Sequence, residues 1–265
     1  MTSADYSQVV RLVQNAREII FDRELAHQVT KKGLADYVTQ VDFAVQDYLR
    51  RELYSRWPQI DLMAEEQKDR PPVEGRQVWI LDPIDGTTNL IRGYRHSAVS
   101  LALWDRDHLA FGVVYNPFSE ETFTAARGEG AFLNGQPIQV GDAASIDQCL
   151  VTVGTCPYRK SSAAVNFPLF QQVFLESLDL RRSGSAALDL AYLACGRIDC
   201  YFELDLKPWD YAAGTLLVQE AGGRVTGWRG ETPNLAQNCD LLATNGPVHG
   251  HLLDLLGKAL DQETR

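Results

Sequence analysis

Residues 79–89 read WILDPIDGTTN, an apolar strand pattern that runs directly into Asp82, Pro83, Asp85 and Gly86. Asp-Pro and Asp-Gly are turn-forming pairs, so we expect the chain to turn sharply where the strand ends. Within a turn the Cα atoms of Asp82 and Asp85 can approach to within about 7 Å, so both carboxylates can reach one cation or two adjacent cations. Two-metal sites hold their ions roughly 3.5–4 Å apart, and Asp82 is the candidate bridging ligand.

The residues that follow this turn, Gly86, Thr87 and Thr88, resemble the opening of a helix. Unpaired backbone N–H groups and the helix dipole bind anions there, and glycine permits close approach. One short segment could therefore supply metal ligands and a phosphate-binding turn. The alternative is that Asp-Pro and Asp-Gly only form a turn, and the spacing alone does not decide between the two.

Other acids are candidates only in combination. Glu65 and Glu66 follow an apolar run and could supply further carboxylates or form an ordinary solvated pair. Asp210 begins a helix pattern, where a capping role is the default. Asp42 lies at the start of a helix pattern and Glu203 at the end of a strand pattern. None of these residues is convincing alone.

The composition is that of a globular protein with an excess of acids. The 265 residues include 25 Lys and Arg and 35 Asp and Glu, a net charge of −10, and 45% are hydrophobic. A chain of this size buries about 73% of its unfolded surface, which fits one large or two medium domains. Because a negative surface repels phosphate backbones and anionic lipids, we expect neither a nucleic-acid nor a membrane partner. Gathered acids could instead bind divalent cations that hold an anionic substrate.

The termini and the cysteines point to a cytoplasmic protein. Residues 1–10 lack the pattern of a secretory signal, and no window contains 18 consecutive apolar residues. The five cysteines are odd in number and form neither a C-x-x-C pair nor a zinc ligand set, so we expect reduced, mostly buried thiols.

Hydrophobic periodicity predicts an α+β first half and an α/β second half. In the first half two helices are followed by a run of strands that we expect to be antiparallel, and the polar stretch 30–36 is a loop or hairpin. In the second half strands and helices alternate. No linker separates the halves, so we expect residues 1–145 to carry the metal site and residues 146–265 to complete a substrate pocket at a shared interface. The predicted helices are 9–20, 41–49, 166–177, 186–195, 210–221 and 248–260, and the predicted strands are 78–81, 98–104, 109–115, 150–153, 198–203 and 241–244, with turns at 127–130 and 134–135.

Signatures of other chemistries are missing. The sequence contains no G-x-x-x-x-G-K-[ST], G-x-S-x-G or H-E-x-x-H motif, and Gly128-x-Gly130 lacks the third glycine of a dinucleotide fingerprint. His96 could donate to a substrate, but a structural role is favoured for a lone histidine.

Taken together, the motifs resemble the inositol monophosphatase family of magnesium-dependent, lithium-sensitive phosphatases. They are AEE at 64–66, WILDPIDGTTN at 79–89 and PWDYAAGTLLVQEAGG at 208–223, in this order, with further likeness at 31–42, 127–135 and 181–203. The resemblance implies a layered αβαβα sandwich of the inositol monophosphatase and fructose-1,6-bisphosphatase type, with the site in the cleft between the halves. Family members are commonly homodimers.

The resemblance implies two to three magnesium ions. Asp82 would bridge the first and second ions, and the backbone carbonyl of Ile84 would contribute to the first. Asp42 would lie near a third, weaker ion that Glu65 contacts through water. The implied metal residues are Asp42, Glu65, Asp82, Ile84, Asp85 and Asp210.

The resemblance also implies roles in substrate binding and catalysis. Glu65 and Thr87 would orient the attacking water and, with Asp82, form the catalytic set. Backbone N–H groups of Gly86 and Thr87 would receive the phosphate, and Lys31 matches the lysine of the family's mobile loop. The implied substrate-binding residues are Asp85, Gly86, Thr87, Gly184, Ser185, Ala186, Glu203 and Asp210.

The leading hypothesis is a magnesium-dependent phosphomonoesterase acting on a small polyol or sugar phosphate, with inositol 1-phosphate as the first substrate to test. The alternatives are a fructose-1,6-bisphosphatase, a histidinol-phosphatase or a 3′(2′),5′-bisphosphate nucleotidase, and a non-catalytic binding or regulatory homologue. Two departures from the family pattern, Ala64 in place of glycine and Leu90 in place of phenylalanine, affect local geometry and remove no ligand.

Overall fold

The strand that ends in the two aspartates is β4 (Gln77–Asp85), and its residues from Val78 onward are buried. The computed structural model describes residues 1–26, 28–33 and 36–263. Strand β4 lies second in a seven-stranded sheet of order β3-β4-β5-β6-β7-β8-β9. The other members are β3 (Asp61–Ala64), β5 (Ala98–Asp105), β6 (His108–Asn116), β7 (Glu121–Ala126), β8 (Gly130–Leu133) and β9 (Gln136–Ile138).

The pairing of this sheet is antiparallel except at β3, which runs parallel to β4 with Ala64 opposite Leu81. The prediction of antiparallel strands therefore holds for β4 to β9. The parallel strand β3 was not predicted. Because parallel strands end at the same edge of a sheet, Glu65 emerges beside Asp82, and its N–H donates to the carbonyl of Leu81 at 3.2 Å.

The second sheet has five strands in the order β11-β10-β12-β14-β13. Strands β11, β10 and β12 are mutually parallel, and β14 is antiparallel to β12 and β13. Their bounds are Leu150–Val153 for β10, Asp179–Arg181 for β11, Cys200–Leu206 for β12, Arg224–Gly227 for β13 and Cys239–Thr244 for β14.

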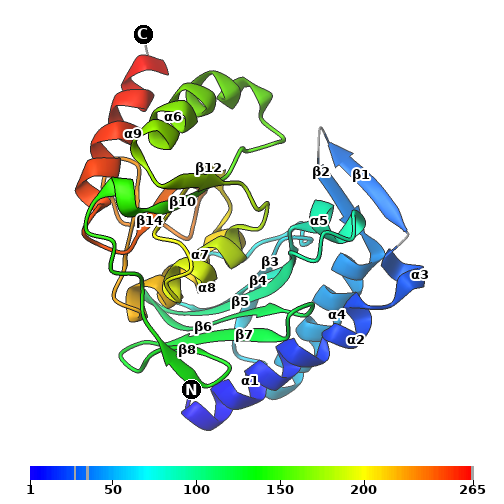
Figure 1. Cartoon of the computed structure of the whole chain (residues 1–265). Coiled ribbons are helices and arrows are strands. Elements are labelled where there is room, and N and C mark those ends of the chain that lie inside the picture. Colours follow the sequence, from blue (N-terminus) through cyan, green and yellow to red (C-terminus); the bar gives the residue numbers. More distant parts are fainter. Residues whose placement is uncertain (27, 34–35, 264–265) are drawn as a thin grey trace.

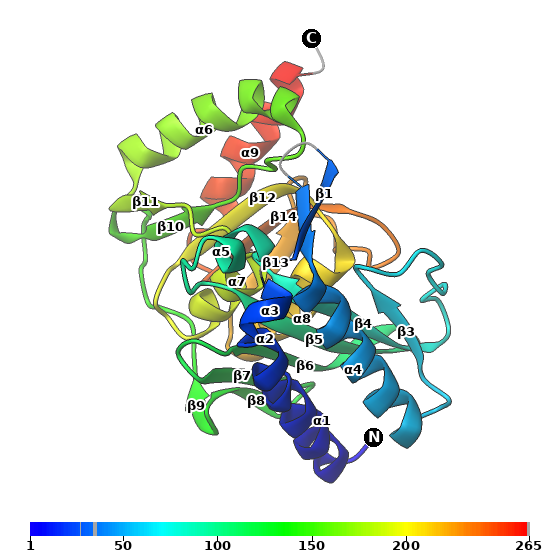
Figure 2. The ribbon, with the colours of Figure 1, turned by 90° about the vertical axis from the view of Figure 1, so that its right-hand side faces the viewer.

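Helices divide the molecule into layers (Figures 1 and 2). Helices α1 (Ser3–Asn15), α2 (Arg17–Ile20) and α4 (Gln40–Arg56) cover one face of the first sheet. Helices α7 (Ala186–Ala194) and α8 (Pro208–Glu220) lie between the sheets, and α6 (Ala163–Glu176) and α9 (His249–Glu263) cover the outer face of the second sheet. This arrangement confirms the αβαβα fold. The short helices are α3 (Arg23–Ala26), α5 (Thr87–Ile91) and the 3₁₀ turns Ile146–Gln148 and Lys160–Ser162.

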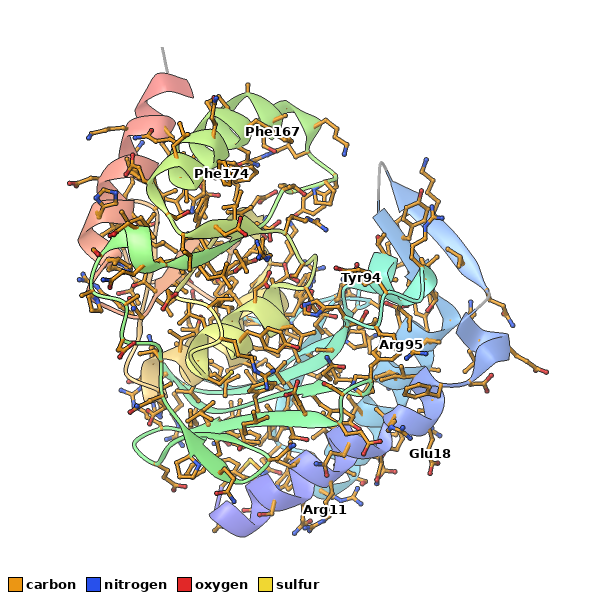
Figure 3. All side chains as sticks on the ribbon, viewed as in Figure 1. Arg11, Glu18, Tyr94, Arg95, Phe167 and Phe174 are labelled. Atoms are coloured by element: carbon orange, nitrogen blue, oxygen red, sulfur yellow. The ribbon has the colours of Figure 1, made fainter. Side chains whose placement is uncertain are left out.

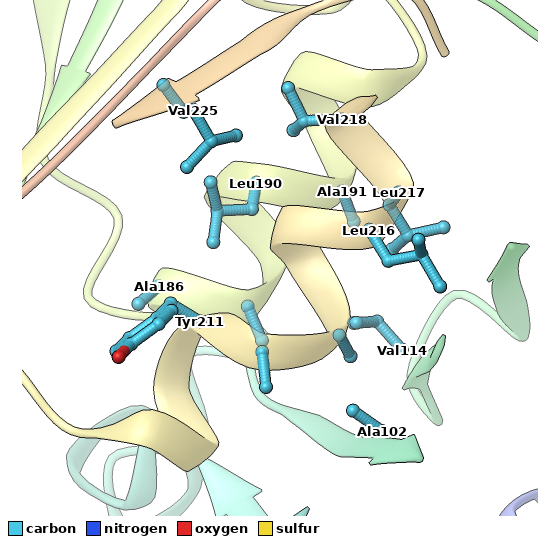
Figure 4. Packing of buried hydrophobic residues seen from close by; sticks show 14 of the residues in the cluster. Ala102, Val114, Ala186, Leu190, Ala191, Tyr211, Leu216, Leu217, Val218 and Val225 are labelled. Carbon is cyan, nitrogen blue, oxygen red and sulfur yellow. The ribbon is translucent and has the colours of Figure 1, made fainter. Parts of the chain in front are cut away.

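Buried hydrophobic side chains pack closely in the middle layer (Figure 4), and two of its close contacts require glycine. A Cβ added at Gly112 of β6 would lie 3.0 Å from the carbonyl oxygen of Ala213, and one added at Gly214 would lie 2.5 Å from the Cβ of Leu190. The backbone of helix α8 therefore lies against the backbone of β6 on one side and against the Leu190 side chain of α7 on the other, which fixes the position of its first turn.

One local prediction needs correction, and two others are confirmed. The predicted helix 9–20 is interrupted at Ala16, whose N–H bonds back to Val13 in a tighter turn, so α1 and α2 are separate. The polar stretch 30–36 forms part of a hairpin of β1 (Val29–Gly33) and β2 (Asp36–Thr39), with residues 34 and 35 outside the described part of the chain. The turns at 127–130 and 134–135 are confirmed, with Asn134 and Gly135 at φ 49° and 78°.

The expectations for membrane spans, cysteines and the boundary between the halves can also be compared with the structure. No described helix is both long enough and apolar enough to cross a membrane. The five thiols are free, and all except Cys195 are buried. The proposed boundary near residue 145 falls between β9 and β10, although one hydrophobic cluster includes residues of both sheets.

Candidate active site

Three carboxylates, two from β4 and one from α8, meet at the end of β4. One oxygen each of Asp82, Asp85 and Asp210 lies within 4.8 Å of the other two. In a regular strand, side chains three residues apart point to opposite faces. The pairing of β4 with β5 shifts register between Asp82 and Asp85, and this irregularity turns both side chains toward the same point.

Each carboxylate is held by backbone or hydroxyl donors. The N–H of Ile84 donates to Asp82 Oδ1 at 2.9 Å. Asp85 Oδ2 accepts from Ser185 Oγ at 2.5 Å and from the N–H of Ala187 at 2.7 Å, both at the start of α7. Asp210 Oδ2 accepts from the N–H of Lys207 at 2.8 Å and so caps α8 from its third position. The capping role expected for Asp210 and its place in the acid cluster therefore coexist.

Glu65 borders this cluster and faces a lysine of the β1–β2 hairpin. The Nζ of Lys32 lies 3.7 Å from Glu65 Oε1 and forms a closer ion pair with Glu66. The sequence pattern singled out Lys31, which is exposed on β1, whereas Lys32 is the residue that approaches the acids.

Asp42 connects the start of α4 to the start of α5. Its carboxylate is fully buried, and Oδ2 accepts from the N–H and the hydroxyl of Thr39 at 2.8 and 2.6 Å. The hydroxyl of Thr87 lies 3.0 Å from Asp42 Oδ1 and 3.0 Å from the carbonyl oxygen of Ile84. Asp42 thus fixes the Thr87 side chain beside the acid cluster.

Burial makes the charged form of these acids costly. It raises the pKa of Asp82 and Asp210 well above the ordinary range, and nearby carboxylates raise it further. Burial also raises the pKa of Glu65 to about 8, with Lys32 opposing the shift, and that of Asp85 to about 6, with its donors from Ser185 and Ala187 opposing. Buried, mutually repelling oxygen ligands suit a hard divalent cation such as magnesium, so the donor set fits the expected metal.

Helix α5 begins next to the cluster. Gly86 has φ 88°, and a Cβ there would lie 3.0 Å from the carbonyl oxygen of His96 and 3.2 Å from that of Gly184. The first N–H groups of a helix have no partner within the helix and are available to an anion. The Asn89 amide donates to the carbonyls of His96 and Ser183 at 2.7 and 3.1 Å, which joins α5 to the loop before α7.

A pocket of about 450 Å³ opens from this helix start, which we call the Arg182 pocket. It is lined by Tyr37, Glu65, residues 86–89, Thr155, Pro157, Tyr158, Arg182 and Gly184. Ser185 and Ala186 are buried behind its wall, and the Ser185 hydroxyl points to Asp85.

Glu203 is held behind the loop that follows β10. Its carboxylate accepts from the Tyr201 hydroxyl at 2.7 Å and from the N–H of Cys156 at 3.1 Å. A Cβ at Gly154 would lie 1.7 Å from the Glu203 carboxyl carbon, so this side chain fits only because residue 154 is glycine.

Sequence reasoning missed several residues that complete this arrangement. Arg182 lines the Arg182 pocket, and its Nη1 lies 2.4 Å from the position that a Cβ of Gly184 would occupy. Asp189 is buried and accepts from Ser183 Oγ at 2.6 Å, which holds the loop that carries Gly184. Only tertiary contacts reveal these roles. The ring of His96 packs edge-on against Tyr192 at 5.6 Å between ring centres, and its buried Nε2 has no hydrogen-bond partner among the described residues.

Comparison with known proteins agrees with this geometry. The model of the inositol monophosphatase family matches residues 1–265. An inositol-1-monophosphatase of Synechocystis sp. is 40% identical over 230 residues, which are 86% of this chain and 80% of that protein. Nus factor SuhB of Escherichia coli (strain K12) is 39% identical over 224 residues, 83% of this chain and 84% of that protein. The solved structure of a Thermotoga maritima IMPase covers 99% of both chains with a TM-score of 0.88 at 30% identity. The chain therefore belongs to the inositol monophosphatase family of phosphatases.

Proposed function

We propose that the protein is a magnesium-dependent phosphomonoesterase that hydrolyses a small polyol or sugar phosphate, with inositol 1-phosphate as the first candidate. The observation that carries this proposal is the cluster of Asp82, Asp85 and Asp210 beside the start of α5, because it pairs cation ligands with a place for an anion. Its relatives include proteins named inositol-1-monophosphatase.

The proposed metal residues are Glu65, Asp82, Asp85, Asp210 and the carbonyl of Ile84, with Asp42 behind them. Magnesium bound there supplies positive charge that stabilises the transferring phosphoryl group and makes a water more acidic. Asp82 is the most buried of the acidic side chains in the cluster. Its carboxylate would be a ligand of both ions.

The chain's own groups position the reactants. The Thr87 hydroxyl, fixed between Asp42 and the Ile84 carbonyl, would orient the attacking water together with Glu65. The N–H groups of Gly86 and Thr87 would hold the phosphate oxygens. Gly184 and Glu203 would contact substrate hydroxyls, with Ser185 and Ala186 supporting that wall.

The other substrates of the superfamily remain in competition. A fructose-1,6-bisphosphatase, a histidinol-phosphatase and a 3′(2′),5′-bisphosphate nucleotidase would use the same metal residues, so the second half of the chain must decide between them. A non-catalytic regulatory homologue is disfavoured because every expected acid is present. Some relatives bear the name Nus factor SuhB, so relatives' names alone do not assign the substrate.

We also propose a cytoplasmic homodimer that is inhibited by lithium and acts on a small phosphorylated substrate. The net charge of −10 disfavours direct binding of nucleic acid or anionic membranes. The division into a metal-carrying subdomain 1–145 and a pocket-completing subdomain 146–265 belongs to the same proposal.

The decisive experiment is a phosphate-release screen over inositol 1-phosphate, fructose 1,6-bisphosphate, histidinol phosphate and adenosine 3′,5′-bisphosphate, ranked by kcat/KM. We expect release only with magnesium, inhibition by lithium, and the highest value for inositol 1-phosphate. Absence of release from every compound would favour the regulatory homologue, and a higher rank for another compound would reassign the substrate.

A further inference from the structure

A second pocket lies on the other side of Glu65 and has a cationic wall. It has a volume of about 560 Å³, and both Glu65 and Asp210 line it, so it is continuous with the proposed metal site. Its basic side chains are Lys32, Lys68, Arg70 and Lys207. We call it the Arg70 pocket.

Arg70 is held in place by an aromatic ring instead of an acid. Its guanidinium lies 4.2 Å from the ring centre of Trp209, which is 4% exposed and directly precedes Asp210. Within the described ranges, neither Arg70 nor Lys68 has a carboxylate oxygen within 4.0 Å. A stacked guanidinium keeps its N–H fork free to bind an oxyanion through two parallel hydrogen bonds.

Lys207, at the start of α8, lines one side of the pocket. Its Nζ lies 5.2 Å from the ring centre of Tyr158 and 3.5 Å from Asp205 Oδ2. The rings of Trp209 and Tyr158 are thus already faced by cations and not left open for a stacking base. Phe43 also lines the pocket and is 38% exposed, so the case for a phosphate group as the occupant rests on the four basic side chains.

The charge of the pocket depends on the metal site. Its four basic side chains face three acids, Glu65, Glu66 and Asp210. Of these acids, Glu65 and Asp210 are proposed magnesium ligands, so bound cations would neutralise them and leave the pocket strongly positive. This step rests on the proposed function.

We propose that the Arg70 pocket binds a second phosphate group of the substrate, with Arg70 and Lys68 as its main contacts and Lys207 as a flanking charge. A bisphosphorylated sugar or polyol then binds more tightly than the monophosphate of the same compound, whichever compound ranks first in the screen. The rival location for a second phosphate is Arg182, the one basic residue among those lining the Arg182 pocket.

The test compares fructose 1-phosphate with fructose 1,6-bisphosphate, which differ only by the second phosphate. Their inhibition constants are measured with magnesium against the best substrate of the screen. If the protein hydrolyses no compound of the screen, titration calorimetry gives the ratio of the two dissociation constants instead. Failure of the proposed function therefore does not remove this test. We expect the bisphosphate to bind at least about tenfold more tightly, which corresponds to about 1.4 kcal/mol.

Variants locate the contact. We expect Arg70→Gln to lower the ratio of bisphosphate to monophosphate affinity about five- to tenfold, and Lys68→Gln to lower it about threefold. The double variant should bring the ratio to one. Monophosphate binding should stay within about twofold of wild type in all three variants. Lys68→Gln leaves the Arg70–Trp209 contact intact, so its effect does not depend on packing. Arg11→Gln is the charge-matched control, because Arg11 lies on α1 (Figure 3) and lines neither pocket.

Three outcomes would overturn the proposal. They are a wild-type ratio near one, a ratio that survives in the double variant, and a loss of preference in Arg182→Gln in place of Arg70→Gln.

Discussion

At the scale of single residues, Asp82 is the acid that we expect to depend most on a bound cation. It is 2% exposed, its pKa is raised by burial and then by the charges of Glu65 and Asp85, and Oδ1 has one backbone donor. A charge placed there without compensation destabilises the fold, so its retention indicates a function.

We therefore predict that Asp82→Asn lowers kcat at least about 100-fold. The free energy of unfolding without magnesium should stay equal or rise, because asparagine removes one of several repelling charges. Kinetics and thermal unfolding measure the two effects, and Asp147→Asn, at an exposed position, is the control. Activity within about threefold of wild type with unchanged magnesium dependence would falsify this role.

Residue types and spacing predicted only part of the site. Asp82 and Asp85 could be predicted from the sequence because a turn sequence brings them together locally. The position of Glu203 depends on Gly154, 49 residues earlier, and that of the Gly184 loop depends on Asn89 and Asp189. Such contacts follow from the tertiary fold, which no local pattern encodes.

At the scale of elements, α8 is the element on which the site depends most. Its first turn carries Asp210, and it continues between α7 and β6, where Gly214 contacts Leu190. A side chain at residue 214 must push the helices apart, whereas Gly257 in α9 has no atom within 4 Å of an added Cβ.

We predict opposite effects for the same substitution at these two glycines. Gly214→Ala should destabilise the protein by about 1–3 kcal/mol through overpacking. Gly257→Ala should stabilise it by up to about 1 kcal/mol, because alanine is the better helix former. Denaturant unfolding measures both changes. Equal effects of the two variants would contradict the close packing of α8.

The start of α9 contains a buried histidine that links it to the second sheet. The ring nitrogens of His249 lie 3.0 Å from the hydroxyls of Thr226 and Thr244, and the residue is fully buried. Burial, together with the charge of Arg224, lowers the pKa of His249 to about 4.

This pKa predicts a loss of stability in acid. The unfolded chain binds a proton near pH 6.5 and the folded chain only near pH 4, so the contribution of His249 is present above pH 6.5 and is lost as the pH falls toward 4. We expect Tm at saturating magnesium to fall between pH 7 and 5, and to fall less in His249→Gln. His108 is partly exposed, so His108→Gln is the control. An identical dependence of Tm on pH in wild type and His249→Gln would refute the role assigned to His249.

Element prediction succeeded where periodicity was long and also at the four-residue strand β10, but it missed other short strands. The buried strand pattern of β4 and the helix pattern of α7 were readable, but β3, β11 and β13 have three or four residues each. Such strands are specified by their neighbours in the sheet and not by their own sequence.

At the scale of the whole molecule, the acid cluster leads us to expect that folding depends on cations. Several buried carboxylates repel one another, and a divalent cation that binds only the folded state stabilises it. The layered fold itself was predictable only through the family motifs, because composition and periodicity gave the halves but not their stacking.

We predict that magnesium raises Tm. At one hundred times its dissociation constant the gain is about 2.7 kcal/mol, which corresponds to roughly 5–10 °C for a chain of this size. Differential scanning calorimetry with and without EDTA measures it, with sodium chloride at equal ionic strength as the control. The rise should vanish in Asp82→Asn, and an equal rise with sodium would rule out a specific site.

The two hydrogen bonds from the start of α7 to Asp85 have a consequence for how this fold can be inherited. Asp85 comes from the first half of the chain, but the groups that orient it, Ser185 and Ala187, come from the second. A chimera joining the halves of two relatives near residue 145 would keep every acid and still misplace this one unless the recipient offered the same two donors. Recombination between relatives is therefore constrained at a point where the covalent chain shows no boundary, and the halves are expected to evolve as one unit.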